Sequence, residues 1–132
     1  ADILSDGSQE FPRLDERTAG QRHRYGYATG FDADPQSGIR LGSLLKHDLD
    51  RGTTEVHDVG PGRAPMEGVF VPRDADAAED EGWVLAYVHD DERGACDVLV
   101  LDAQDFTAPP VATVHLPVRV PFGFHGNWVP AT

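Results

Sequence analysis

The residues with the clearest chemical potential lie near the end of the chain, in the stretch PFGFHGNW at 121–128. A strand there would place Phe122 and Phe124 on one face and His125 on the other, because successive side chains in a strand alternate. Gly123 and Gly126 leave room for the imidazole to approach a metal ion or enter a narrow cavity. Spacing alone favours a structural histidine in a terminal strand, so only the rest of the sequence can support the metal or cavity interpretation.

Short strands separated by turns precede this histidine. We expect extended segments or strands at 10–15, 22–29, 41–49, 53–59, 68–72, 82–89, 96–101 and 111–116. The turn Asp50-Arg51-Gly52 predicts a hairpin, and 82–89 is apolar enough to indicate a strand covered on both faces. Turns or single helical loops are expected at 16–21 and 102–106. The predicted fold class is all-β, an antiparallel meander forming one unit over 1–132, with 1–9 irregular.

Composition supports this class and excludes several functions. The chain has 132 residues, one domain's worth, and its 14 glycines and 10 prolines favour many short elements over long helices. A formal net charge of −12 argues against a nucleic-acid partner, which would require clustered Lys and Arg. The sequence has no apolar run near the length of about 20 residues that a membrane helix needs. The single cysteine, Cys96, excludes an internal disulfide and fits a reducing compartment, so we expect a cytoplasmic protein.

A faint internal repeat has an offset of about fifty residues. The pattern from His47 through Gly52 to 69–71 resembles the pattern from Val100 through Asp105 to 122–124. Periods of roughly 40 to 50 residues are typical of propeller blades, and the chain has room for about three of them. It could therefore be part of a larger propeller, or a small β-sandwich complete in itself. The acidic segment at 74–82 has no functional interpretation beyond solvation.

Six motifs, taken together and in order, resemble the carotenoid cleavage oxygenase family, which includes the lignostilbene dioxygenases and the retinal pigment epithelium isomerase. They are EFPRLD at 10–15, RHRYGYA at 22–28, MEGVFVPR at 66–73, EDEGWVLAYVHD at 79–90, LVLDAQDF at 99–106 and VPFGFHGNW at 120–128. The resemblance covers nearly the whole chain and corresponds to the C-terminal part of the family. It implies roughly three blades of a seven-bladed β-propeller with a ferrous ion held by four histidines on its axis.

By position in the motifs, His125 matches the last of the four iron ligands. Glu10 and Glu67 match carboxylates that accept the ring N–H of ligand histidines, a contact that fixes the tautomer. The family usually has proline where this chain has Gly68. Phe122 and Phe124 could border the substrate passage, and core packing is an equal alternative for both.

The remaining histidines match no metal position of the family, and the sequence contains no HExxH or CxxC motif. We interpret them as structural; they are His23, His47, His57, His89 and His115.

The resemblance implies the C-terminal segment of a non-haem iron(II) dioxygenase. The parent enzyme would use dioxygen to cleave a carbon–carbon double bond of an apolar conjugated substrate, such as a carotenoid, apocarotenoid or stilbene. One histidine cannot define an iron site, so we expect the isolated chain to bind no metal and to be inactive. Open sheet edges would favour its self-association. The alternative is a freestanding β-module that binds a partner and holds no metal.

Overall fold

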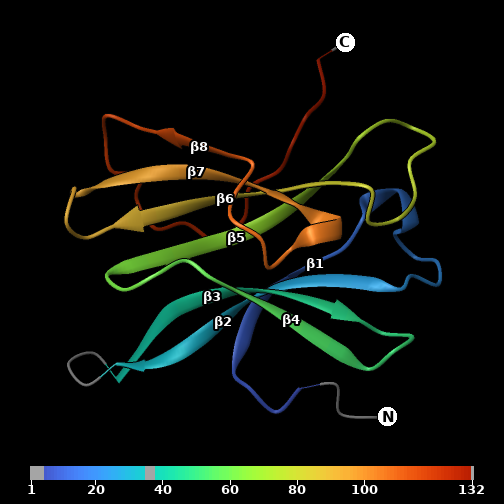
Figure 1. Ribbon diagram of the computed structural model, residues 1–132, viewed down its shortest axis with the longest axis horizontal. Helices are drawn as coiled ribbons and strands as arrows, with labels where there is room; N and C mark the ends of the chain where they lie inside the picture. Colours follow the sequence, from blue (N-terminus) through green and yellow to red (C-terminus); the bar gives the residue numbers. More distant parts are fainter. Residues whose placement is uncertain (1–4, 35–37, 132) are drawn as a thin grey trace.

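Two four-stranded antiparallel sheets make up the computed structural model, which describes residues 5–34 and 38–131 (Figure 1). The first sheet contains β1 (Gln9–Arg13), β2 (Tyr25–Asp34), β3 (Gly38–Asp48) and β4 (Thr53–Asp58). The second contains β5 (Arg63–Pro72), β6 (Gly82–Asp90), β7 (Ala95–Asp102) and β8 (Ala112–His115). In each sheet the strands are neighbours in chain order. The predicted all-β class is confirmed, and the meander runs through both sheets.

The two sheets match the predicted repeat. After β3 and β4, the last two strands of the first sheet, a loop leads into β5. After β7 and β8, the last two strands of the second sheet, the chain continues into the terminal stretch. The chain thus forms two complete sheets and a C-terminal segment where about three blades were expected. The only helical pieces among the described residues are two 3-10 turns, η1 (Glu16–Thr18) and η2 (Ala103–Asp105). None of the described helices is long and apolar enough to cross a membrane.

The core lies between the sheets, where β5 faces β2 and β3 (Figure 1). The ring of Tyr27 stacks on Phe70 at 5.6 Å between centroids and lies 6.2 Å from Phe106. The hydroxyl of Thr29 donates to the carbonyl of Met66 across the same interface at 3.1 Å. Aromatic packing and buried hydrogen bonds therefore fix one sheet on the other.

Strand β6 differs from its prediction. Its residues alternate between the core, as Val84 and Val88 do, and the surface, where Trp83 and Tyr87 are exposed. A strand covered on both faces was expected, and in this structure only one face is covered. The continuous hydrophobicity of β6 thus leaves large apolar side chains on the outer face of the second sheet.

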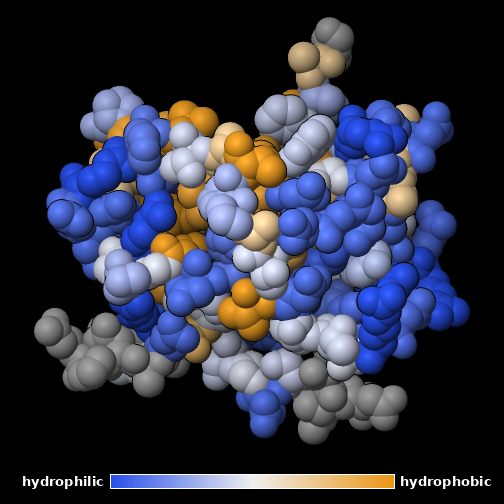
Figure 2. Space-filling view, viewed as in Figure 1, coloured by the Kyte–Doolittle hydropathy of each residue, from blue (hydrophilic) through white to orange (hydrophobic). Residues whose placement is uncertain are grey.

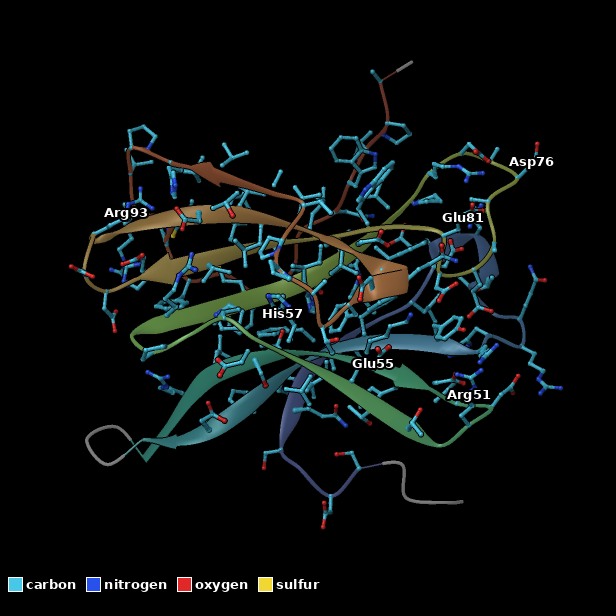
Figure 3. All side chains as sticks on the ribbon, in the orientation of Figure 1. Arg51, Glu55, His57, Asp76, Glu81 and Arg93 are labelled. Carbon is cyan, nitrogen blue, oxygen red and sulfur yellow. The ribbon has the colours of Figure 1, made fainter. Side chains whose placement is uncertain are left out.

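The acidic segment after β5 joins the sheets as well as being solvated. A carboxylate oxygen of Glu79 accepts the backbone N–H groups of Arg24 at 2.6 Å and Tyr25 at 2.7 Å. Asp80 forms an ion pair with the buried ammonium of Lys46 at 2.9 Å. Figure 3 shows Asp76 at the outer tip of this loop and Glu81 closer to the sheet. The sequence predicted only solvation here, because the partners of Glu79 and Asp80 lie more than thirty residues away.

A buried carboxylate holds the far end of the second sheet. Asp97 on β7 is 1% exposed and pairs with Arg63, Arg93 and His115. Burial alone would raise the pKa of Asp97, but the hydrogen bonds from His115 and Arg93 hold that pKa below its usual value. This cluster ties the edge strands β5 and β8 to β7.

The terminal stretch is not a strand, which corrects the prediction. Residues 116–131 have no regular secondary structure. A strand needs a neighbour to complete its hydrogen bonds, and no described strand pairs with this segment. We call residues 117–131 the C-terminal arm. Residues 5–8, ahead of β1, are irregular as expected, whereas Gln9 already belongs to β1 and residues 1–4 lie outside the described residues.

Candidate functional site

The site is built around Glu67, a carboxylate that lies almost completely buried in β5. The pairing of β5 with β6 shifts register between Pro65 and Gly68, so Glu67 sits in a β-bulge. Bulges redirect side chains and are frequent beside functional sites. A carboxylate in this position requires hydrogen-bond donors, because burying it without them would cost several kcal/mol.

The C-terminal arm supplies two of these donors. The ring Nδ1 of His125 lies 2.9 Å from Oε1 of Glu67, and the backbone N–H of Gly126 donates to Oε2 at 2.8 Å. Because a carboxylate only accepts, this contact places the ring hydrogen of His125 on Nδ1. The other ring nitrogen, Nε2, then carries a free lone pair. This tautomer, held by a carboxylate, is the one that binds metal ions through Nε2.

The imidazole is accessible on the side away from Glu67. The side chain of His125 is 71% exposed, and the edge of its ring contacts Phe11 of β1, with 6.0 Å between centroids and an interplanar angle of 88°. Its orientation therefore comes from a few specific contacts. One exposed Nε2 with a fixed tautomer fits one ligand position of a metal ion.

A largely apolar cavity of about 450 Å³ lies beside the histidine. It is open between the outer face of the second sheet and the C-terminal arm. Its apolar lining residues are Met66, Val69, Leu85, Ala86, Tyr87, Val98, Val120, Pro121, Phe124 and Trp128. Such a cavity could accept part of an apolar ligand within reach of His125.

The two phenylalanines proposed to border a passage are separated. Phe124 lines the cavity beside His125. Phe122 instead packs against His89 at 5.9 Å between centroids and lies under the guanidinium of Arg119. They do not share a face, because the arm is not a strand. Phe124 is thus the one placed to meet a ligand of this cavity.

Glu10 lies elsewhere, on β1 opposite Thr29 in the first sheet. Its side chain is exposed and makes no hydrogen bond or ion pair with any residue in 5–34 or 38–131. It borders a second hollow that His23 and His47 also line. Its role as a partner of a ligand histidine stays a prediction, which would require a histidine from outside this chain.

The other histidines have protein partners of their own. Both ring nitrogens of His47 are engaged, by Thr54 at 2.8 Å and Gln9 at 2.7 Å, and burial lowers the pKa of His47. His57 lies between the sheets, with Nδ1 at 3.0 Å from the carbonyl of Phe106 (Figure 3). In the part of the chain that the structure describes, no group of three or more His, Cys, Asp or Glu residues is arranged to hold a metal ion.

Sequence reasoning missed two contributors to the site. Arg13 forms an ion pair with Glu67 at 3.3 Å, and it donates to the side chain of Asn127 at 2.9 Å. Arg13 lies within EFPRLD and Asn127 within VPFGFHGNW, two of the six motifs that carry the family resemblance. The motifs do not show which of their side chains contact each other in the folded chain.

Solved structures with the same arrangement define the class of protein. The cobalt-substituted Synechocystis ACO superposes with a TM-score of 0.89 at 33% identity, covering 98% of this chain and 27% of that one. A chimera of ACO and RPE65 gives a TM-score of 0.88 at 28% identity, with the same coverage. The two sheets and the arm are thus a fragment of a β-propeller enzyme fold.

The family follows from the sequence comparisons. A family model described as retinal pigment epithelial membrane protein, RPE65, matches residues 1–130, and the chain belongs to this family. It is 39% identical to carotenoid 9,10(9',10')-cleavage dioxygenase 1 of Pisum sativum over 96% of this chain and 25% of the relative. It is 41% identical to a carotenoid cleavage oxygenase of Mycobacterium tuberculosis over 100% of this chain and 26% of the relative. The chain therefore spans about a quarter of the length of these relatives.

Proposed function

We propose that this chain is the C-terminal segment of a non-haem iron(II) dioxygenase that cleaves a carbon–carbon double bond of a carotenoid, apocarotenoid or stilbene-type substrate. The hydrogen bond from His125 to Glu67 is the observation that carries this proposal, because it leaves Nε2 free for a metal ion. Family membership and the names of the relatives support the same kind of reaction. The remaining ligands would come from other parts of the full-length protein.

In this proposal His125 would hold the iron together with ligands from the rest of the full-length protein, and the iron would supply the activation of dioxygen for its addition to the double bond. The residues of this chain have simpler tasks. Glu67 holds the Nδ1 hydrogen of His125 and so maintains the tautomer that binds the metal. The apolar cavity beside Phe124 accepts part of the conjugated substrate and excludes water from it. We include a cytoplasmic location in the proposal, on the ground of the unpaired Cys96.

An activity assay on the full-length protein tests this function. The iron-loaded enzyme is incubated with a carotenoid or stilbene, and loss of the absorbance of the conjugated system is followed. His125→Ala is expected to lower the rate by more than about 100-fold, because a first ligand matters at least as much as its hydrogen-bond partner. His23→Ala, which removes a histidine from the irregular segment just before β2, is the matched control. An unchanged rate in His125→Ala would refute the site assignment.

We further expect the 132-residue chain by itself to be inactive, to bind no iron and to self-associate. Most of its exposed large apolar side chains lie on the second sheet and the arm, among them Val114, Val118 and Trp128. Figure 2 shows hydrophobic patches, coloured orange, within the largely hydrophilic surface. Exposed apolar area and unpaired strand edges both favour association. Sedimentation should show dimers or larger species at micromolar concentration, and a monomer at all concentrations would contradict this.

A further inference from the structure

Strand β1 contains a distortion that faces the candidate site. Gln9 and Glu10 pair in register with β2, and the next pairing is between Arg13 and Tyr27, so β1 has an extra residue at this point. Within this bulge Phe11 has a φ of +56°, a conformation that costs a residue with a Cβ roughly 1 kcal/mol or more. Strain of this kind persists only where surrounding contacts hold it in place.

The bulge directs two side chains at the C-terminal arm. Phe11 presents its ring to the edge of His125, and Arg13 reaches the residues that follow that histidine. One terminal nitrogen of Arg13, Nη1, donates to Oε1 of Glu67 at 3.3 Å and to the carbonyl of Gly126 at 3.1 Å. The guanidinium of Arg13 thus bonds the same carboxylate oxygen that receives the imidazole.

The other terminal nitrogen of Arg13 completes a closed network. Nη2 donates to Glu16 at 2.8 Å and to the side-chain oxygen of Asn127 at 2.9 Å. The amide nitrogen of Asn127 in turn donates to both oxygens of Glu16 at 3.1 Å. One guanidinium, on a side chain that is 15% exposed, therefore joins β1, η1, β5 and the arm.

We propose that Arg13 is a positioning residue, which sets the orientation of His125 toward the metal by fixing both Glu67 and the arm. This inference rests on the proposed function, since it presumes that His125 binds the metal. The arm has no strand pairing of its own, and the imidazole is largely exposed. Its direction is therefore set by the hydrogen bonds around it, and Arg13 makes two of those to the arm.

The geometry requires arginine. A planar guanidinium offers five N–H groups in a fixed fork and can serve four acceptors at once. A lysine ammonium in the same place has three donors around one nitrogen and cannot span Glu67, Gly126, Glu16 and Asn127 together. Arg13→Lys therefore keeps the positive charge but loses the simultaneous hydrogen bonds to these four residues.

The test uses the full-length protein and Co²⁺ as a spectroscopic probe of ligand geometry. Affinity for Co²⁺ is titrated, and the visible absorption of the bound ion is recorded for wild type, Arg13→Lys and Arg13→Gln. We expect both variants to bind Co²⁺ about 10- to 100-fold more weakly, the range for residues that support metal ligands, and to show a changed spectrum. Arg13→Lys should bind Co²⁺ no more tightly than Arg13→Gln, although lysine keeps the positive charge.

Arg17→Lys is the matched control. Arg17 lies on η1, pairs with Asp15 and donates to the carbonyls of Asp74, Ala75 and Ala78, so it is equally engaged but has no contact with the arm. It should leave the affinity and the spectrum unchanged. An Arg13→Lys protein with the affinity and spectrum of wild type would overturn the inference.

A milder variant, Asn127→Ala, decides the case if the Arg13 variants do not fold. It removes one partner of Arg13 and leaves the others, and we expect a smaller loss of Co²⁺ affinity with a shifted spectrum. An unchanged spectrum would count against the inference. If His125→Ala does not alter Co²⁺ binding, the proposed function fails. If His125→Ala weakens Co²⁺ binding and the Arg13 and Asn127 variants do not, only this inference fails.

Discussion

Replacing Glu67 with glutamine is expected to lower the affinity of the full-length protein for ferrous iron about 10- to 100-fold, the usual effect of losing the carboxylate behind a metal-binding histidine. The carboxylate accepts from both His125 and Gly126. A glutamine has one acceptor oxygen, so its NH₂ group must face either the N–H of Gly126 or the Nδ1–H of His125. Either arrangement releases part of the C-terminal arm or permits the wrong tautomer of the ring.

Iron titration measures this effect, with hydrogen exchange of the Gly126 amide as a readout that needs no metal. Exchange at Gly126 should become faster where the NH₂ group faces its N–H, because the hydrogen bond to Oε2 is then lost. Where the NH₂ group faces His125, the effect is on the tautomer of the ring and is measured by the iron affinity. Glu92→Gln, at an exposed position in the turn after β6, is the control and should change neither quantity. Wild-type affinity together with wild-type exchange in Glu67→Gln would show that the carboxylate does not orient the histidine.

The second large effect concerns the joint between the sheets. Lys46→Met should reduce the free energy of unfolding by about 3 kcal/mol, the lower end of the range for breaking a buried ion pair. Lys46 is 4% exposed, pairs with Asp80 and donates to the carbonyl of Ala103 at 2.6 Å. Methionine fills a similar volume but removes the ammonium donor from Oδ2 of Asp80 and from the carbonyl of Ala103.

Urea unfolding followed by tryptophan fluorescence measures this loss. The double variant Lys46→Met with Asp80→Asn separates the loss of the ion pair from the cost of an unpaired carboxylate, because it also removes the charge of Asp80. It should recover part of the stability that the single variant loses. A loss below about 0.5 kcal/mol, the usual range for exposed surface changes, would mean that Lys46 does not act as a buried link.

The sequence predicted the strands well because their signals are local. Alternation and turn residues placed β3, β4 and β6 to β8 within about three residues of their observed bounds, whereas β2 continues about five residues beyond its predicted end and β5 begins about five residues before its predicted start. Gly52 illustrates why, since its φ of +65° is the turn conformation that glycine adopts without strain. The hairpin between β3 and β4 could therefore be read from three consecutive residues.

The site could be predicted only in part. The resemblance pointed to His125 and Glu67, and the structure brings these two side chains together. It could not reveal Arg13, whose partner Glu67 lies 54 residues further along the chain. The positive φ of Phe11 was equally hidden, because nothing in a phenylalanine next to a proline signals a left-handed backbone.

The C-terminal arm shows a second limit of sequence reasoning. Alternating Phe122 and Phe124 suggested a strand, but strand formation depends on a partner for the backbone hydrogen bonds. Among the described residues no strand pairs with the arm, which is held by side chains of Arg13, Glu16 and Glu67 and by the backbone N–H of Cys96, which donates to Val118. The local sequence pattern could not show that hydrogen bonds to side chains, and not pairing with a neighbouring strand, would hold this segment in place.

The central claim is that His125 is a metal ligand whose direction is set by Glu67. Its most direct test is the iron content of full-length wild type, His125→Ala and His23→Ala after identical loading with ferrous iron and removal of the excess. We predict close to one iron per protein for wild type and His23→Ala, and a large loss for His125→Ala. Full iron content in His125→Ala would contradict the account.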